Sequence, residues 1–201
     1  AMRLPLGYRV LYQPSATAAM DTVLANLAGR GSFHFVHGAF SERWFRTAQE
    51  LKIPCDALAA DLARAVRWRD APVPADADLI AVTHNETATG VKSDIGGIRA
   101  AMDAAGHGAL LFVDGVSSIA SMDFRFDEWG VDIAVTGSQK GFMLPVGLAI
   151  LGFSDKAIEA SKAAKLPRTF FDIADMTKGY AANAFPYTPP VGLMNGLKLS
   201  S

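Results

Sequence analysis

Three short apolar runs constrain the fold more than any other feature of this sequence. They occupy residues 79–82, 109–113 and 131–135, are rich in Val, Ile and Leu, and show no alternation of apolar with polar residues. A strand of a parallel sheet is buried on both faces and therefore carries apolar side chains at successive positions. The runs predict strands of a parallel sheet.

Segments with helical spacing alternate with these strands. Residues 95–105 lie between the first two runs, carry apolar residues at helical intervals and are followed by Gly106, a common helix stop. They complete a βαβ unit, and the alternation predicts an α/β fold. Elsewhere the pattern predicts helices at 17–28, 41–51 and 154–165, strands at 32–36 and 148–153, a loop at 71–77, and irregular chain before a short apolar segment at 191–199.

Composition narrows the class of protein. The chain has 201 residues, 50% of them hydrophobic, and a net charge of −1. This length suits one large domain or two small ones, and we expect a single domain over residues 1–201. The balanced charge argues against nucleic acid or an anionic membrane as a partner, and favours small-molecule chemistry.

The cysteine content and the apolar runs bear on location. Cys55 is the only cysteine, so no internal disulfide can form, and we expect it to be a buried small residue. No signal sequence is recognisable, which favours a cytoplasmic location. The longest apolar run, 141–153, is interrupted by Pro145 and Gly147 and is shorter than the roughly 20 residues that span a bilayer. We expect no membrane segment.

Polar residues follow each of the three apolar runs. In an open parallel sheet, ligands bind beyond the carboxyl ends of the strands, where such residues converge. The segments are Thr-His-Asn-Glu-Thr-Ala-Thr-Gly at 83–90, Asp-Gly-Val-Ser-Ser at 114–118 and Thr-Gly-Ser-Gln-Lys-Gly at 136–141. An acid, several hydroxyls and one lysine are thus expected at one edge. The four histidines have no ligand spacing, and we expect no metal site.

A carboxylate after one strand and a lysine after the next suit pyridoxal phosphate. Lys140 could bond to the cofactor covalently, and Asp114 could keep its pyridine nitrogen protonated. Taken alone, Lys140 is more often a solvated lysine in a turn and Asp114 a helix cap. Together, in this order along the chain, they favour the cofactor.

The sequence around these residues resembles the class V aminotransferases, which are fold type I pyridoxal-phosphate enzymes, and most closely their serine–glyoxylate and alanine–glyoxylate branch. The resemblance runs from residue 79 to 152 and resumes at 166–168 and 185–190. Its motifs include His-Asn-Glu-Thr-Ala-Thr-Gly-Val, Leu-Phe-Val-Asp-Gly-Val-Ser-Ser-Ile, Phe-Asp-Glu-Trp-Gly-Val-Asp, Gly-Ser-Gln-Lys-Gly-Phe-Met-Leu-Pro and Phe-Pro-Tyr-Thr-Pro-Pro. It implies a three-layer αβα fold with a mostly parallel central sheet.

The resemblance also implies roles for single residues around the cofactor ring. Lys140 would carry the cofactor, and Asp114 would pair with its pyridine nitrogen. Thr87 would donate to the phenolic oxygen. Phe40 would cover one face of the ring, with a place in the apolar core as the alternative, and Val116 would support the other face.

Further residues would hold the phosphate. Amides at a helix N-terminus favour an anion, and the segment Ser-Ala-Thr-Ala-Ala at 15–19 is placed to supply them. The expected phosphate contacts are Thr17, Ala18, Ala19 and Gln139. Thr188 resembles a threonine that reaches the phosphate of a neighbouring subunit, which implies a homodimer.

The implied activity is transfer of an amino group from serine or alanine to an oxo acid such as glyoxylate. Phosphoserine is an alternative donor, because residues 32–44 look more like phosphoserine or uncharacterised aminotransferases of the class. A noncatalytic remnant that binds cofactor or dimerises is another alternative. The arginine that clamps the substrate carboxylate is not recognisable, and we expect a fragment that lacks an N-terminal segment and a C-terminal small domain.

Overall fold

A computed structural model describes residues 8–61, 64–71 and 73–200 of the chain. The ends of the domain predicted at 1–201 lie outside these ranges, so its extent stays a prediction. The main strands are β1 (Tyr8–Gln13), β2 (Ser32–Val36), β3 (Cys55–Ala59), β4 (Leu79–Thr83), β7 (Leu110–Asp114), β8 (Ile133–Gly137) and β9 (Ala149–Ser154). The helices are α1 (Ala16–Leu27), α2 (Ala39–Glu50), α3 (Ile95–Ala104), α4 (Asp155–Ser161), α5 (Ile173–Ala181) and α6 (Val191–Ser200). Short elements are β5 (Asn85–Glu86), β6 (Val91–Lys92) and the 3-10 turns η1 (Trp68–Asp70) and η2 (Thr169–Phe171).

The seven main strands form one sheet in the order β1-β9-β8-β7-β4-β2-β3. Strand β9 runs antiparallel to both its neighbours, β8 and β1, whereas every other pair in the sheet is parallel. Strands β1, β2, β4, β7 and β8 therefore all end at the same edge. The three predicted apolar runs are confirmed as β4, β7 and β8, and every residue of these strands is buried.

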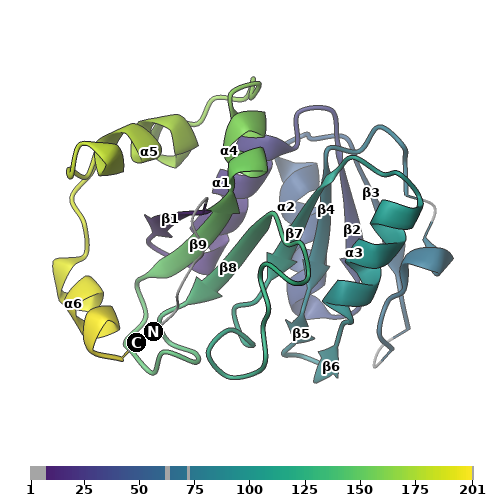
Figure 1. Ribbon diagram of the computed structural model, residues 1–201. Helices are drawn as coiled ribbons and strands as arrows, with labels where there is room; N and C mark the ends of the chain where they lie inside the picture. Colours follow the sequence, from purple (N-terminus) through teal and green to yellow (C-terminus); the bar gives the residue numbers. More distant parts are fainter. Residues whose placement is uncertain (1–7, 62–63, 72, 201) are drawn as a thin grey trace.

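Helices cover both faces of the sheet, which confirms the three-layer αβα arrangement (Figure 1). Helices α1, α2 and α4 contribute to the apolar cluster on one face, and α3 contributes to the cluster on the other. Parallel strands need crossover connections, and a helix that returns across the sheet begins at the edge where the preceding strand ends. The N-termini of α1 and α2 consequently lie at the edge where β1 and β2 end.

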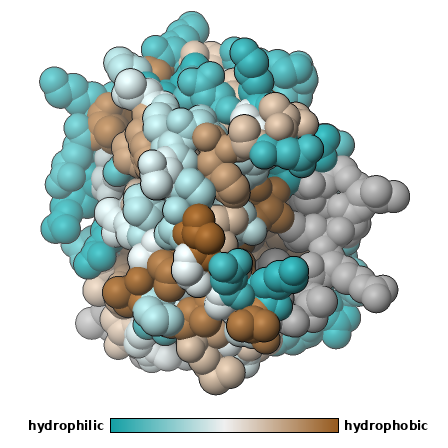
Figure 2. Space-filling model, turned by 90° about the vertical axis from the view of Figure 1, so that its left-hand side faces the viewer, coloured by the Kyte–Doolittle hydropathy of each residue, from teal (hydrophilic) through white to brown (hydrophobic). Residues whose placement is uncertain are grey.

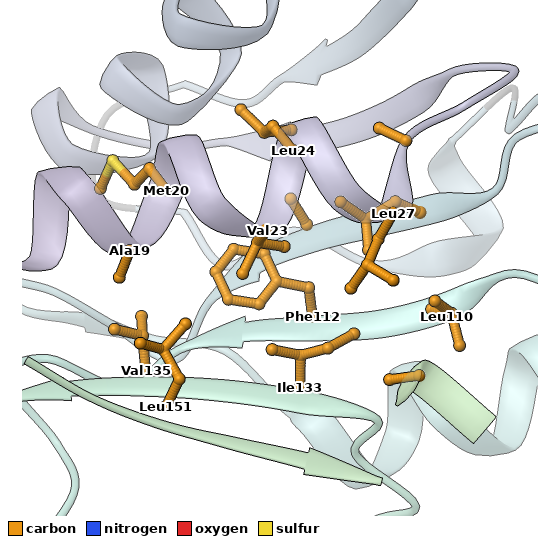
Figure 3. Packing of buried hydrophobic residues seen from close by; sticks show 14 of the residues in the cluster. Ala19, Met20, Val23, Leu24, Leu27, Leu110, Phe112, Ile133, Val135 and Leu151 are labelled. Carbon is orange, nitrogen blue, oxygen red and sulfur yellow. The ribbon is translucent and has the colours of Figure 1, made fainter. Parts of the chain in front are cut away.

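Helix α1 anchors this face of the core. Its sequence is rich in alanine, a strong helix former, and Ser15 caps its N-terminus by accepting from the Ala18 N–H at 3.1 Å. Figure 3 shows Val23 above Phe112, and Ala19 on the side of Val135 and Leu151. Fully burying each large apolar side chain contributes about 1.5–3 kcal/mol.

Two expectations were wrong. The chain before residue 191 is not irregular, because Ile173–Ala181 forms α5, which begins at an Asp172 cap and buries Ile173 and Met176. Cys55 is only partly buried, because it lies on β3, an edge strand of the sheet. The predicted helix at 154–165 ends earlier, at Ser161.

Strands β1 and β3 were not predicted, since each lies at a sheet edge and lacks a continuous apolar run. Within the described ranges, no helix is both long and apolar enough to cross a membrane.

Candidate active site

The edge where the parallel strands end brings most of the predicted site residues together. Thr83 and Asp114 pair across β4 and β7, and Asp114 pairs with Val135 of β8, so these strands end in register. Gln13 and Gly137 both pair with Ala149, which brings the end of β1 to the same level. The loops after β1, β2, β4, β7 and β8 therefore leave the sheet at one edge.

Asp114 is the last residue of β7, and its carboxylate is held from two sides. The indole N–H of Trp44 donates to Oδ2 at 2.8 Å, and the Val116 N–H donates to Oδ1 at 3.0 Å. Burial raises the pKa of Asp114, the two hydrogen bonds oppose that rise, and the negative charge of Glu86 adds to it. The carboxylate has about four acceptor positions and two of them are used, so it can still pair with a cationic ring nitrogen.

Glu86 fastens the loop after β4 to the start of α2. Its carboxylate accepts the N–H of Phe40 at 3.3 Å and of Ser41 at 3.0 Å, the Ser41 hydroxyl at 2.9 Å, and the Ala88 N–H at 3.1 Å. A Cβ at Gly38 would lie 2.4 Å from Glu86 Cγ, so only glycine fits there. The backbone of Phe40 and that of Ala88, the residue after Thr87, are thus held by one side chain.

A pair of hydrogen bonds joins the loops after β4 and β7. Asn85 Nδ2 donates to the Ser117 hydroxyl at 2.9 Å, and that hydroxyl donates to the Asn85 carbonyl at 2.9 Å. Thr87 is exposed and Val116 is half-buried beside these contacts. Both side chains are therefore available to a ligand at the edge.

Lys140 lies in a tight turn directly after β8. Its N–H donates to the Gly137 carbonyl at 3.3 Å, and its side chain is exposed to solvent. A Cβ at Gly141 would lie 2.4 Å from the Ile119 carbonyl oxygen, so the turn can pack against residues 119–120 only with glycine at this position. Gln139 folds back over Gly137, where its Oε1 would lie 2.7 Å from an added Cβ.

The start of α1 supplies part of the predicted phosphate site. The first N–H groups of a helix have no intrahelical acceptor, so the Ala16 and Thr17 amides suit an anion. The Ala18 N–H donates to the Ser15 hydroxyl, and the Ala19 N–H donates to the Ser15 carbonyl. Of the predicted contacts, Thr17 is the best placed, because the amides of Ala18 and Ala19 already have acceptors.

Thr188 lies apart from Asp114. It is exposed and lines a cavity of about 230 Å³ together with Tyr12, Pro14 and Tyr180, next to the loop that precedes α1. Its contact with a second subunit stays a prediction.

Burial keeps the histidines near the edge neutral. It lowers the pKa of His34 to about 3, and burial together with a smaller effect of Lys92 lowers the pKa of His84 to about 4. Burial also lowers the pKa of His37, against the charge of Glu86. These side chains are poor proton donors at neutral pH, so Lys140 is the stronger candidate for acid–base chemistry.

Sequence reasoning assigned no role to Trp44 or Glu86. A helical spacing of four places Trp44 on the same side of α2 as Phe40, which was a usable signal. Glu86 lies between two residues of a motif already singled out, but its partners are 45 and 46 positions away in sequence. In the described part of the chain, no cluster of three or more histidine, cysteine or acidic residues could hold a metal.

The chemistry of these groups fits pyridoxal phosphate. A buried carboxylate with free acceptor positions, an exposed lysine one strand away and open amides at a helix N-terminus match the pyridine nitrogen, the aldehyde and the phosphate of the cofactor. The model of the aminotransferase class V family matches residues 9–195. This chain belongs to the class V aminotransferases.

Two curated relatives of this class V chain are glyoxylate aminotransferases. An L-aspartate–glyoxylate aminotransferase of Paracoccus denitrificans is 54% identical over 94% of this chain and 50% of its own length. A serine–glyoxylate aminotransferase of Hyphomicrobium methylovorum is 40% identical over 100% of this chain and 52% of its own length. The class V chain therefore spans about half the length of these relatives.

A solved aminotransferase structure has the same fold. The phosphoserine aminotransferase of Cytophaga hutchinsonii superposes with a TM-score of 0.86 at 35% identity, covering 98% of this chain and 54% of that one. The match supports the topology described above, and it implies dependence on pyridoxal phosphate.

Proposed function

We propose that this chain is the cofactor-holding part of an aminotransferase that moves an amino group from a small amino acid to glyoxylate. The observation that carries the proposal is the placement of buried Asp114 and exposed Lys140 after neighbouring strands at one sheet edge. The glyoxylate acceptor is supported by the names of relatives that are 54% and 40% identical.

Each residue at this edge has a separate role toward the cofactor. When bound, pyridoxal phosphate supplies a protonated ring that withdraws electrons from the Cα of the amino acid. Asp114 holds the proton at the ring nitrogen, and Thr87 donates to the phenolic oxygen. Phe40 and Val116 flank the two faces of the ring and exclude water from them.

Lys140 has two roles. Its Nζ would hold the cofactor covalently, and as a free amine it would accept the proton from the substrate Cα and deliver it to the cofactor's C4′. Thr17 and Gln139 hold the phosphate, with Ala18 and Ala19 beside it in the first turn of α1, so that the lysine and the substrate stay aligned. Thr188 from a second copy completes the phosphate site in a homodimer.

The donor is serine or alanine in our preferred assignment. Aspartate is a second candidate, because the relative that is 54% identical uses L-aspartate. Phosphoserine and a noncatalytic remnant are not favoured, since the two curated relatives above, at 54% and 40% identity, are glyoxylate aminotransferases.

The test locates the covalent bond. The purified chain would be mixed with pyridoxal phosphate, reduced with borohydride and digested, and the labelled peptide identified by mass spectrometry. We expect the label on Lys140 and its loss in Lys140→Ala, while Lys162→Ala, which alters an exposed lysine at the C-terminal end of α4, keeps it.

Donor choice follows from the same preparation. Serine, alanine, aspartate and phosphoserine would each be added to the cofactor-loaded protein before any reduction, and a donor should remove the visible absorbance of the bound cofactor, which glyoxylate added afterwards should restore. A label on another lysine, or no label, would contradict the proposed site.

A further inference from the structure

Trp44 makes a buried hydrogen bond that the activity outlined above does not use. Its indole N–H lies 2.8 Å from Oδ2 of Asp114, and the two residues are 2% and 6% exposed. Among the described residues, the other donor to this carboxyl is the Val116 N–H, which takes the opposite oxygen. One carboxylate oxygen therefore receives its hydrogen bond from a side chain, and the other receives it from the backbone.

The indole is held rigidly. Its ring packs edge-on against Phe112 with centroids 4.2 Å apart, and Phe112 lies two residues before Asp114 on β7. A small cavity beside the hydrogen bond, lined by Ser41, Trp44 and Asp114 among others, has no room for a water molecule. Water therefore cannot replace the indole as a donor unless the packing changes.

We propose that Trp44 is a positioning residue that orients the Asp114 carboxylate toward the ring nitrogen of the cofactor and stabilises its charge. This inference rests on the proposed function, since both assume that Asp114 pairs with the ring nitrogen of the cofactor. Helix α2 would then serve the cofactor twice, through Phe40 at its first turn and Trp44 one turn later.

The direction of the effect follows from charge. A protonated ring nitrogen pairs with the ionised form of Asp114, and a donor to a carboxylate favours that form. The titratable groups that face Asp114 work against ionisation or leave it unchanged. Glu86 raises its pKa, and His34, in the wall of the same cavity, stays neutral because its own pKa is about 3. Lys140, on the next loop, is exposed to solvent.

The experiment removes the N–H in two ways. Trp44→Phe deletes the donor but also some volume, so β-(3-benzothienyl)alanine at position 44 is used as well, because it keeps the bicyclic shape and replaces N–H with sulfur. Trp68→Phe is the control, since Trp68 packs against His107, far from this edge.

Two measurements are made on each protein. The first is the dissociation constant of pyridoxal phosphate between pH 4 and pH 9, from the visible absorbance. The second is the ionisation of Asp114 without cofactor, from the infrared band of the protonated acid that disappears in Asp114→Asn.

We expect both changes at position 44 to weaken cofactor binding about tenfold and to move its acid limb upward by about one pH unit, since a hydrogen bond to a charged group is worth that much. The infrared titration should move in the same direction, and Trp68→Phe should leave both measurements unchanged. Unchanged titrations with the benzothienyl side chain would overturn the inference even if Trp44→Phe unfolds. If the parent chain binds no cofactor, but the changes at position 44 still move the infrared titration of Asp114, the proposed function is overturned. The role of Trp44 toward Asp114 then remains.

Discussion

At the scale of the residue, Glu86 shows how a buried charge can organise a binding edge. Its side chain is fully buried, and burial alone would raise its pKa, but hydrogen bonds from Ser41, Ala88 and Phe40 outweigh that effect and lower it. The carboxylate joins two loops that are distant in sequence. It thereby fixes the backbone of Phe40 and the residue next to Thr87.

Glu86→Gln should destabilise the chain by about 2 kcal/mol at neutral pH, because an amide presents a donor where the site offers only donors. A lowered folded pKa means that the stabilisation is complete above the unfolded value of 4.5 and is lost as the pH falls through the folded value. The difference from the parent should therefore shrink at acid pH, as measured by urea unfolding at several pH values.

Glu42→Gln provides a matched control for that change. Glu42 is an exposed acid in the first turn of the same helix, and its loss should cost less than about 1 kcal/mol. An equal loss in both variants, or a pH-independent loss in Glu86→Gln, would rule out the hydrogen-bond explanation.

At the scale of the element, the turn after β8 presents Lys140. Gly137 and Gly141 bracket the turn, which packs against the segment that follows Asp114 and Val116. The turn therefore couples the lysine to the loop that carries the acid. Its geometry depends on a close backbone approach, which a side chain at Gly141 would prevent.

Gly141→Ala should lower the free energy of unfolding by about 1–3 kcal/mol, because the new methyl group would overlap the carbonyl of Ile119. Labelling of Lys140 by pyridoxal phosphate and borohydride should fall with it, since the turn must move. Gly108→Ala is the comparison, because nothing lies within 4 Å of a Cβ there. Normal labelling of Gly141→Ala would show that the turn is not needed to present the lysine.

At the scale of the whole molecule, apolar side chains remain on the surface near α6. Met143 and Val146 are 87% and 73% exposed, and Leu199 of α6 is 88% exposed. The 143–147 loop and α6 adjoin each other, since Leu144 and Leu193 approach glycines of the opposite segment. Figure 2 shows hydrophobic residues among polar ones on the side that includes α5 and α6. Such exposed apolar surface favours association with a second copy.

The double variant Met143→Lys and Val146→Lys should shift a homodimer toward monomer in sedimentation experiments, because two charges would be buried without partners. The fold should survive, since both side chains are exposed in the single chain. Ala104→Lys, at an exposed position near the C-terminal end of α3, should leave the mass unchanged. A variant that stays dimeric would place the interface elsewhere.

The sequence by itself determined the parallel strands and the residues at their ends. Continuous apolar runs identify strands buried on both faces, and chain direction then places Asp114 and Lys140 at one edge. Helices α1, α2 and α3 also follow from local spacing and caps. These features depend on residues that are close together in the sequence, so the amino-acid sequence is enough to predict them.

The tertiary structure decided which side chains meet. Trp44 and Asp114 are separated by 70 positions, and Glu86 and Ser41 by 45, so no local pattern could pair them. Helix α5 and the edge strands β1 and β3 are likewise stabilised by packing and pairing with distant segments rather than by their own sequence pattern. Their positions depend on burial across the whole sheet, which only the folded chain defines.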